Sequence, residues 1–164
     1  MLPPAVRSVA DALAARGARG EPVVLPDAAR TAAQAAAALG CEVGAIANSL
    51  VFDAGGAPVL VLTSGAHRVD TALVAGTLGL ARLDRADPEF VRRHTGQAIG
   101  GVAPLGHPQP LPTYVDRWLA RHDVVWAAAG HPHAVFPTSY AELLALTGGR
   151  ALDVGPEAAQ GSGA

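Results

Sequence analysis

Two apolar segments on either side of a glycine-containing turn constrain the fold of this chain more than any other feature. Residues 48–53 and 58–63 contain Leu, Val and Phe, and the turn residues Ala54-Gly55-Gly56-Ala57 separate them. This arrangement predicts a β-hairpin. Because both arms are strongly apolar, we expect them to be central strands of a sheet, with both faces covered.

Helices and further strands are expected on both sides of this hairpin. Val6, Val9 and Leu13 recur at helical spacing and predict a helix over about residues 5–16. Other helices are expected to run from a residue that can cap a helix to a glycine that can end one: Thr31 to Gly40, Asp70 to Gly79, Asp87 to Gly96 and Ser139 to Gly148. Short strands are expected at residues 22–26, 111–116 and 124–129. This irregular order predicts an α+β domain with a mixed sheet.

Composition excludes several classes of function. The chain has 164 residues, the size of one ordinary domain, and its 12 basic residues are all Arg. Without Lys, the chain has no Schiff-base lysine and no Walker A phosphate site. A net charge of −2 argues against a protein that coats nucleic acid through its phosphates. The single Cys41 excludes an intramolecular disulfide and a cysteine-based zinc cluster.

The segment Thr95–Gly106, with the sequence TGQAIGGVAPLG, is the strongest candidate for a ligand-binding loop. Gly100 and Gly101 allow the backbone to come very close to a ligand and to present N–H groups to it. The same two glycines are also compatible with a tight turn that only requires a positive φ. The spacing alone leaves both interpretations open.

This segment resembles the TG-x₃-GG-[VI]-[SA]-P-[LF]-G signature of the YbaK/prolyl-tRNA synthetase-associated family. Four further blocks are similar to motifs of that family in the same order, at residues 46–52, 66–73, 111–116 and 125–130. The resemblance runs from about Asp27 to Ala151. It implies a single α+β domain over residues 1–154, with a mixed, partly closed, barrel-like sheet flanked by helices. Residues 155–164 are expected to form a flexible tail.

Members of this family are free-standing or synthetase-inserted domains that hydrolyse amino acids from wrongly charged tRNA. The resemblance therefore implies trans-editing hydrolysis of the aminoacyl ester of a misacylated tRNA, with water as the nucleophile. The expected partner is the acceptor end of the tRNA, with an aminoacyl-tRNA synthetase as a second candidate. No cofactor, metal or membrane contact is expected, and the expected location is the cytoplasm. The alternatives are a member that binds aminoacyl-tRNA or a synthetase without turnover, and a deacylase for another ester.

The candidate catalytic residues are Gly100, Gly101 and Asn48. The two glycines would supply backbone N–H donors to the oxygen that becomes negative during ester hydrolysis. Asn48 occupies the position of the family's usual lysine, and its amide can form hydrogen bonds but cannot neutralise an anion. Asn48 is also compatible with a purely structural role at the start of a strand. The candidate substrate contacts are Thr31, Ile99, Ala128, Gly130 and His131.

Other reactive side chains fit structural roles better. The chain has no G-x-S-x-G nucleophile elbow, and Cys41 lies outside any local catalytic motif. The spacing of His107, His131 and His133 matches no known zinc pattern, although His131 or His133 could shuttle a proton or contact the adenosine. Asp70 and Asp87 are interpreted as helix caps. We further expect Asn48, the glycine segment and the strand end at residues 127–130 to line one pocket.

Overall fold

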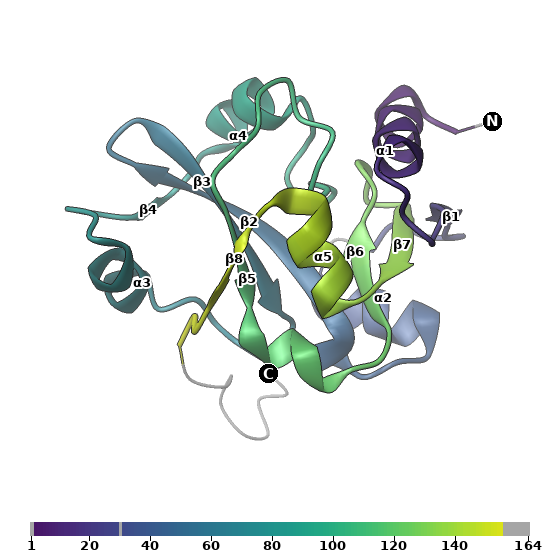
Figure 1. Cartoon of the computed structure of the whole chain (residues 1–164). Helices are drawn as coiled ribbons and strands as arrows, with labels where there is room; N and C mark the ends of the chain where they lie inside the picture. The colour runs from purple at the N-terminus through teal and green to yellow at the C-terminus, as the bar shows by residue number, and fades with distance from the viewer. Residues whose placement is uncertain (1, 30, 156–164) are drawn as a thin grey trace.

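The structure is a computed structural model that describes residues 2–29 and 31–155; in this part of the chain five α-helices flank an eight-stranded mixed sheet (Figure 1). The strands are β1 (Val23–Val24), β2 (Ile46–Ala54), β3 (Ala57–Ser64), β4 (Asp84–Arg85), β5 (Thr113–Asp116), β6 (Val125–Ala128), β7 (Ala134–Thr138) and β8 (Arg150–Leu152). Their order is β1-β7-β6-β2-β3-β5-β8, with β4 attached to β2. The α+β class with a mixed sheet is confirmed. Most of the expected tail, residues 156–164, lies outside the described residues.

The predicted hairpin is confirmed and forms the centre of the sheet. Strands β2 and β3 pair antiparallel in continuous register from Ala47 opposite Ser64 to Ala54 opposite Ala57. Both turn glycines have positive φ, 67° at Gly55 and 100° at Gly56. A two-residue turn with positive φ at both positions matches the right-handed twist of the strands that it joins. The turn therefore fixes the register of the two longest strands.

All five predicted helices are present: α1 (Pro4–Ala15), α2 (Ala32–Leu39), α3 (Thr71–Leu78), α4 (Pro88–Thr95) and α5 (Tyr140–Thr147). Each helix after α1 begins at a side chain that accepts a hydrogen bond from the backbone N–H three residues later, and ends at a glycine with positive φ. The capping side chains belong to Thr31, Asp70, Asp87 and Ser139. These local signals were sufficient to place the helices because they act within a few residues of each helix end.

Three strands lie where the sequence predicted none: β4, β7 and β8. Strand β7 pairs antiparallel with β6 and with β1, whereas β8 pairs parallel with β5. The expected segments 22–26, 111–116 and 124–129 contain the shorter strands β1, β5 and β6. The turn between β6 and β7 carries His131, so the unpredicted β7 helps to position a candidate site residue.

The sheet is split on one side of β2. Along one edge, β2 pairs with β3 over almost its whole length. Along the other edge it pairs with β6 only at Ile46 and Ala47, and with β4 only at Phe52 and Asp53. In the described part of the chain, residues 48–51 have no strand partner on that edge, and the end strands β1 and β8 do not pair with each other. The sheet is therefore open, with a gap beside Asn48.

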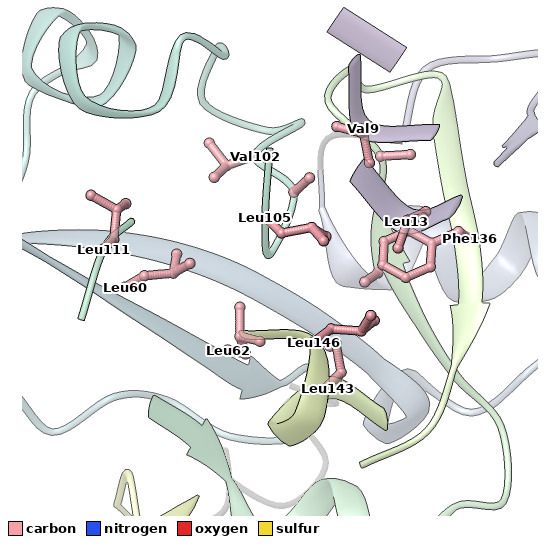
Figure 2. Packing of buried hydrophobic residues seen from close by; sticks show 14 of the residues in the cluster. Val9, Leu13, Leu60, Leu62, Val102, Leu105, Leu111, Phe136, Leu143 and Leu146 are labelled. Atoms are coloured by element: carbon pink, nitrogen blue, oxygen red, sulfur yellow. The ribbon is translucent and has the colours of Figure 1, made fainter. Parts of the chain in front are cut away.

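The main hydrophobic cluster anchors the glycine segment beneath this gap. Figure 2 shows Val102 and Leu105, from the segment that follows α4, packed with Leu60 and Leu62 of β3. The same cluster contains Val9 and Leu13 of α1, Phe136 of β7, and Leu143 and Leu146 of α5. Because its apolar residues are buried among helices and strands, the glycine segment has a fixed base. None of the described helices is both long and apolar enough to span a membrane.

Candidate functional site

A small pocket of about 40 Å³ occupies the gap in the sheet. Asn48 reaches it from β2, Thr31 from the start of α2, Gly100 from the glycine segment, and Ala128 and His131 from the end of β6 and the turn after it. Asn48, the glycine segment and the end of β6 therefore line one pocket, as the sequence predicted. The roles of the individual residues stay predictions.

A larger groove of about 480 Å³ continues from the pocket along β2 toward β4 and α4. The groove and the pocket share Thr31, Ala32, Asn48, Ser49, Gly100 and Val102. Ile99 lines the groove and is 52% exposed, so its apolar side chain is available to a ligand. Arg85 of β4 brings a positive charge to the groove. The described lining of the pocket contains no Arg, Asp or Glu.

The two adjacent glycines have different environments. Gly100 lines the pocket and the groove and has a φ of 93°, a conformation that favours glycine. Gly101 lies against the turn that contains His131: a Cβ atom added at Gly101 would lie 2.7 Å from the His131 backbone. The N–H of Gly101 donates to the carbonyl of Ala98 at 3.1 Å. Gly100 therefore faces the pocket, whereas Gly101 closes a turn and allows two loops to touch.

Gly130 is a second candidate, after Gly101, that the structure places outside the linings of the pocket and the groove. Its φ is 98°, and a Cβ atom added there would lie 2.9 Å from the carbonyl oxygen of Ala5 in α1. In this structure Gly130 permits the close approach of α1 to the β6–β7 turn. Any contact of Gly130 with a substrate stays a prediction.

Strand alternation separates Asn48 from its neighbour Ser49. Because side chains alternate along a strand, Ser49 lies on the same face of β2 as Ala47 and Val51, which belong to the main hydrophobic cluster. Asn48 lies on the opposite face, is exposed, and reaches the pocket where β2 and β6 diverge. Thr31, across the pocket, uses its Oγ1 to accept a hydrogen bond from the N–H of Gln34 at 3.1 Å.

Ser49 and Arg85 are lining residues that the sequence did not indicate. Ser49 lines both the pocket and the groove, and its hydroxyl oxygen is buried without a hydrogen-bond partner in the described part of the chain. Arg85 reaches the groove because the two-residue strand β4 pairs with β2 at Phe52. The signal for Ser49 was its place next to Asn48, whereas nothing in the sequence around Arg85 indicated a strand.

The hydrogen bonds of the histidines restrict their chemistry. The backbone N–H of His133 donates a hydrogen bond to the ring nitrogen Nδ1 of His131 at 3.1 Å. In a neutral His131 ring the proton therefore resides on the other nitrogen, Nε2. His107 lies away from the pocket lining, and its Nε2 is 2.8 Å from the carbonyl oxygen of Ala103. Burial lowers the pKa of His107 below its usual range. No group of three or more His, Cys, Asp or Glu side chains among the described residues could hold a metal ion.

The remaining reactive side chains have structural roles. Burial raises the pKa of the Cys41 thiol, which disfavours the thiolate that a nucleophile requires. Asp70 and Asp87 cap α3 and α4, as predicted, by accepting hydrogen bonds from the N–H groups of Leu73 and Phe90. A water nucleophile is thus consistent with the groups around the pocket.

Known proteins resemble this chain in sequence and in structure. The uncharacterized protein YwhH of Bacillus subtilis is 33% identical over 115 residues, which are 69% of this chain and 72% of YwhH. The proline–tRNA ligase of Geobacter sulfurreducens is 33% identical over 79 residues, which are 48% of this chain and only 14% of the ligase. A solved structure described as a candidate trans-editing enzyme for prolyl-tRNA synthetase has a TM-score of 0.88 and 45% identity, and the match covers 95% of this chain and 99% of that one.

The sequence profile of the aminoacyl-tRNA editing domain matches residues 26–146. The matched range includes the start of α2, β2 with Asn48, the glycine segment and the β6–β7 turn, which meet at the pocket. The chain therefore belongs to the aminoacyl-tRNA editing domain family, of the YbaK/prolyl-tRNA synthetase-associated type.

Proposed function

We propose that this protein hydrolyses the aminoacyl ester of a misacylated tRNA in trans. The observation that carries the proposal is the junction at Gly100, where a small pocket opens into a larger groove. An aminoacyl ester has the same two parts, a small acyl side chain and a large nucleoside. The similarity to a candidate trans-editing enzyme for prolyl-tRNA synthetase supports a tRNA for proline as the substrate.

The pocket is the proposed site of the amino-acid side chain. A volume of about 40 Å³ accommodates roughly three water-sized groups, if one water requires about 10–15 Å³. Its walls carry the methyl groups of Ala32, Ala35, Ala127 and Ala134. A small apolar side chain, such as that of alanine, fits these walls better than the ring of proline.

The groove is the proposed site of the terminal nucleoside of the tRNA. Its volume of about 480 Å³ lies in the range that encloses a small ligand. The exposed side chain of Ile99 offers an apolar surface to a base, and Arg85 offers a charge to a phosphate. Positive charge at the groove, within a chain of net charge −2, is consistent with a protein that holds only the end of a tRNA.

Hydrolysis would begin with the attack of water on the ester carbonyl, and negative charge would develop on the carbonyl oxygen. The backbone N–H of Gly100 is the proposed donor to this oxygen, and one such donor can contribute roughly 3–4 kcal/mol. The N–H of Gly101 already donates to Ala98, so Gly101 is assigned to shaping the loop. His131, with its proton on Nε2, is a proposed donor to the leaving 3′-oxygen or the adenosine.

One observation favours a second candidate function. Where the family usually has lysine, this chain has Asn48, and the described lining of the pocket carries no guanidinium. A pocket without that charge is compatible with a protein that binds aminoacyl-tRNA, or a synthetase, without turnover. Binding and hydrolysis therefore have to be measured separately.

The test is a deacylation assay with the purified chain and a panel of tRNAs, each charged with its cognate or a smaller amino acid. We expect turnover on a tRNA for proline that carries a small amino acid. We also expect a loss of about 100-fold in the Gly100→Ala variant: alanine keeps the backbone N–H, but it disfavours the φ of 93° and would displace the peptide group, and a misplacement of about 1 Å can cost about 100-fold in rate. Saturable binding of these tRNAs without release of the amino acid would favour the second candidate. Absence of both would refute the two functions together.

A further inference from the structure

The glycine segment is held from both sides by two side chains that converge on Ala103. The side-chain carbonyl oxygen of Gln97 accepts a hydrogen bond from the N–H of Ala103 at 2.7 Å. On the other side, Nε2 of His107 lies 2.8 Å from the carbonyl oxygen of Ala103. The N–H and the carbonyl group of Ala103 are thus both bound by side chains. Gln97 precedes Gly100 and Gly101 in the chain, and His107 follows them.

Ala103 is a fixed point for a second reason. It is fully buried in the main hydrophobic cluster, and its neighbours Val102 and Leu105 are 3% exposed in the same cluster (Figure 2). Gln97 is itself 4% exposed, although glutamine is usually found at the surface. The buried side chain of Gln97 thus links two ends of the glycine segment that are six residues apart. We call this hydrogen bond between Gln97 and Ala103 the strut.

The end of α4 holds this strut in place. The N–H of Gln97 donates to Oγ1 of Thr95 at 2.9 Å, and Oγ1 of Thr95 lies 2.7 Å from the carbonyl oxygen of Val91. Thr95 is 1% exposed. The chain of contacts therefore runs from the last turn of α4, through Thr95 and Gln97, to Ala103.

Residues 98–102 span the distance between the two ends of the strut. Gly100 and Gly101 lie within this span, and Gly101 is in close contact with the backbone of His131. Because the ends of so short a span are fixed, the direction of the Gly100 peptide group depends on the separation that Gln97 maintains. Gln97 itself lines neither the pocket nor the groove.

We infer that Gln97 is a positioning residue for ester hydrolysis, which acts by fixing the peptide group of Gly100, whose N–H is the proposed oxyanion donor. The inference rests on the proposed function, since it requires Gly100 to act as the oxyanion donor. A displacement of about 1 Å at a reacting group can reduce the rate about 100-fold. Loss of the strut is therefore expected to reduce kcat strongly and to leave KM nearly unchanged, because the groove is intact.

Two substitutions at position 97 separate the strut from simple packing. Gln97→Met keeps the length and approximate volume of the side chain but removes the acceptor, whereas Gln97→Glu keeps an acceptor oxygen. Ser64→Ala is the matched control: Ser64 is fully buried and its hydroxyl donates to the carbonyl of Gly44 at 2.7 Å, outside the linings of the pocket and the groove. Each variant is compared with the wild type in deacylation kinetics, thermal unfolding and amide hydrogen exchange.

For Gln97→Met we expect a kcat about 100-fold below that of the wild type, with KM within about threefold. Amide exchange should become faster at residues 98–102, and the Glu variant should recover most of the lost rate. The Ser64→Ala control should lower the unfolding temperature without changing kcat.

A Gln97→Met variant with a kcat within about threefold of the wild type would refute the inference while leaving the proposed function intact, and so would equal losses in the Met and Ser64→Ala variants. Unchanged exchange at residues 98–102 would also refute it, whether or not the Met variant is less stable. A wild type that hydrolyses none of the charged tRNAs would instead overturn the proposed function, and this inference with it.

Discussion

At the scale of single residues, the candidate site depends on which side chains the split in the sheet brings to one place. Asn48 and Gly100 could be named from the sequence because they lie in blocks that resemble family motifs, and His131 because it directly follows such a block. Ser49 and Arg85 could not, since their place depends on strand alternation along β2 and on the pairing of β4 with β2. Sequence spacing also could not distinguish Gly100, which faces the pocket, from Gly101, which closes a turn.

Position 48 provides the first prediction. Asn48→Ala should reduce the deacylation rate about tenfold, or about 1.4 kcal/mol, which lies within the range of one substrate hydrogen bond. Asn48→Lys should tighten the binding of a tRNA-end analogue, with a gain that decreases as salt is added. Binding and rates at two salt concentrations would test this. If both variants equal the wild type, Asn48 has no part in catalysis.

The two glycines provide the second prediction. Gly100→Ala forces a side chain onto a φ of 93°, which strains the backbone at the pocket, so the rate should fall, and the unfolding temperature should fall less than in a variant whose Cβ also clashes with backbone. Gly101→Ala places a Cβ 2.7 Å from the His131 backbone, so both the rate and the unfolding temperature should fall. Thermal unfolding of the two variants is the distinguishing measurement. Equal melting behaviour would contradict the separate environments described for these residues.

At the scale of secondary-structure elements, local signals predicted the hairpin and the helices, whereas nonlocal pairing determined the strands that were missed. The helix caps and the Gly55-Gly56 turn act within a few residues, so the sequence contains them in full. Strand β7 contains Pro137, which is uncommon inside a sheet. Pro137 is tolerated because β1 pairs with β7 only at Ala134 and Val135, so that no strand of the described chain requires an N–H from Pro137 on that edge.

Helix α4 provides the third prediction, since it leads directly into the glycine segment. Asp87→Ala removes a cap that accepts from the N–H of Phe90 at 2.8 Å, and should cost about 1 kcal/mol of unfolding free energy. Asp70→Ala, at the equivalent position of α3, should cost a similar amount. Only the Asp87 variant should also reduce the deacylation rate, because α4 carries Thr95 and the strut. Denaturant unfolding and kinetics of both variants would show whether the two effects separate.

At the scale of the whole molecule, the pH dependence of stability provides the fourth prediction. Burial, the largest cause, lowers the pKa of His107 below its ordinary value of 6.5, and Arg16 lowers it further, against the hydrogen bond to Ala103 that raises it. The unfolded chain therefore binds a proton at His107 more readily than the folded chain does. The contribution of His107 to stability is complete above pH 6.5 and is lost as the pH falls through the lower folded pKa.

Unfolding free energies measured by denaturant between pH 7.5 and pH 5 would check this dependence. The His107→Gln variant keeps a donor for Ala103 but does not titrate, so its stability should fall less steeply over the same range. Parallel curves for the wild type and the variant would show that His107 does not contribute to the dependence.

The central claim is that one molecule combines a pocket for a small amino-acid side chain with a groove for the tRNA end. Its most direct test is single-turnover release of the amino acid from one tRNA for proline, charged either with alanine or with proline. We expect alanine to be released faster by about tenfold or more, because one methylene alone changes the rate by roughly 10- to 200-fold in an apolar pocket, and the proline ring exceeds the alanine side chain by more than that. Equal release of the two amino acids, or release of neither, would contradict the account.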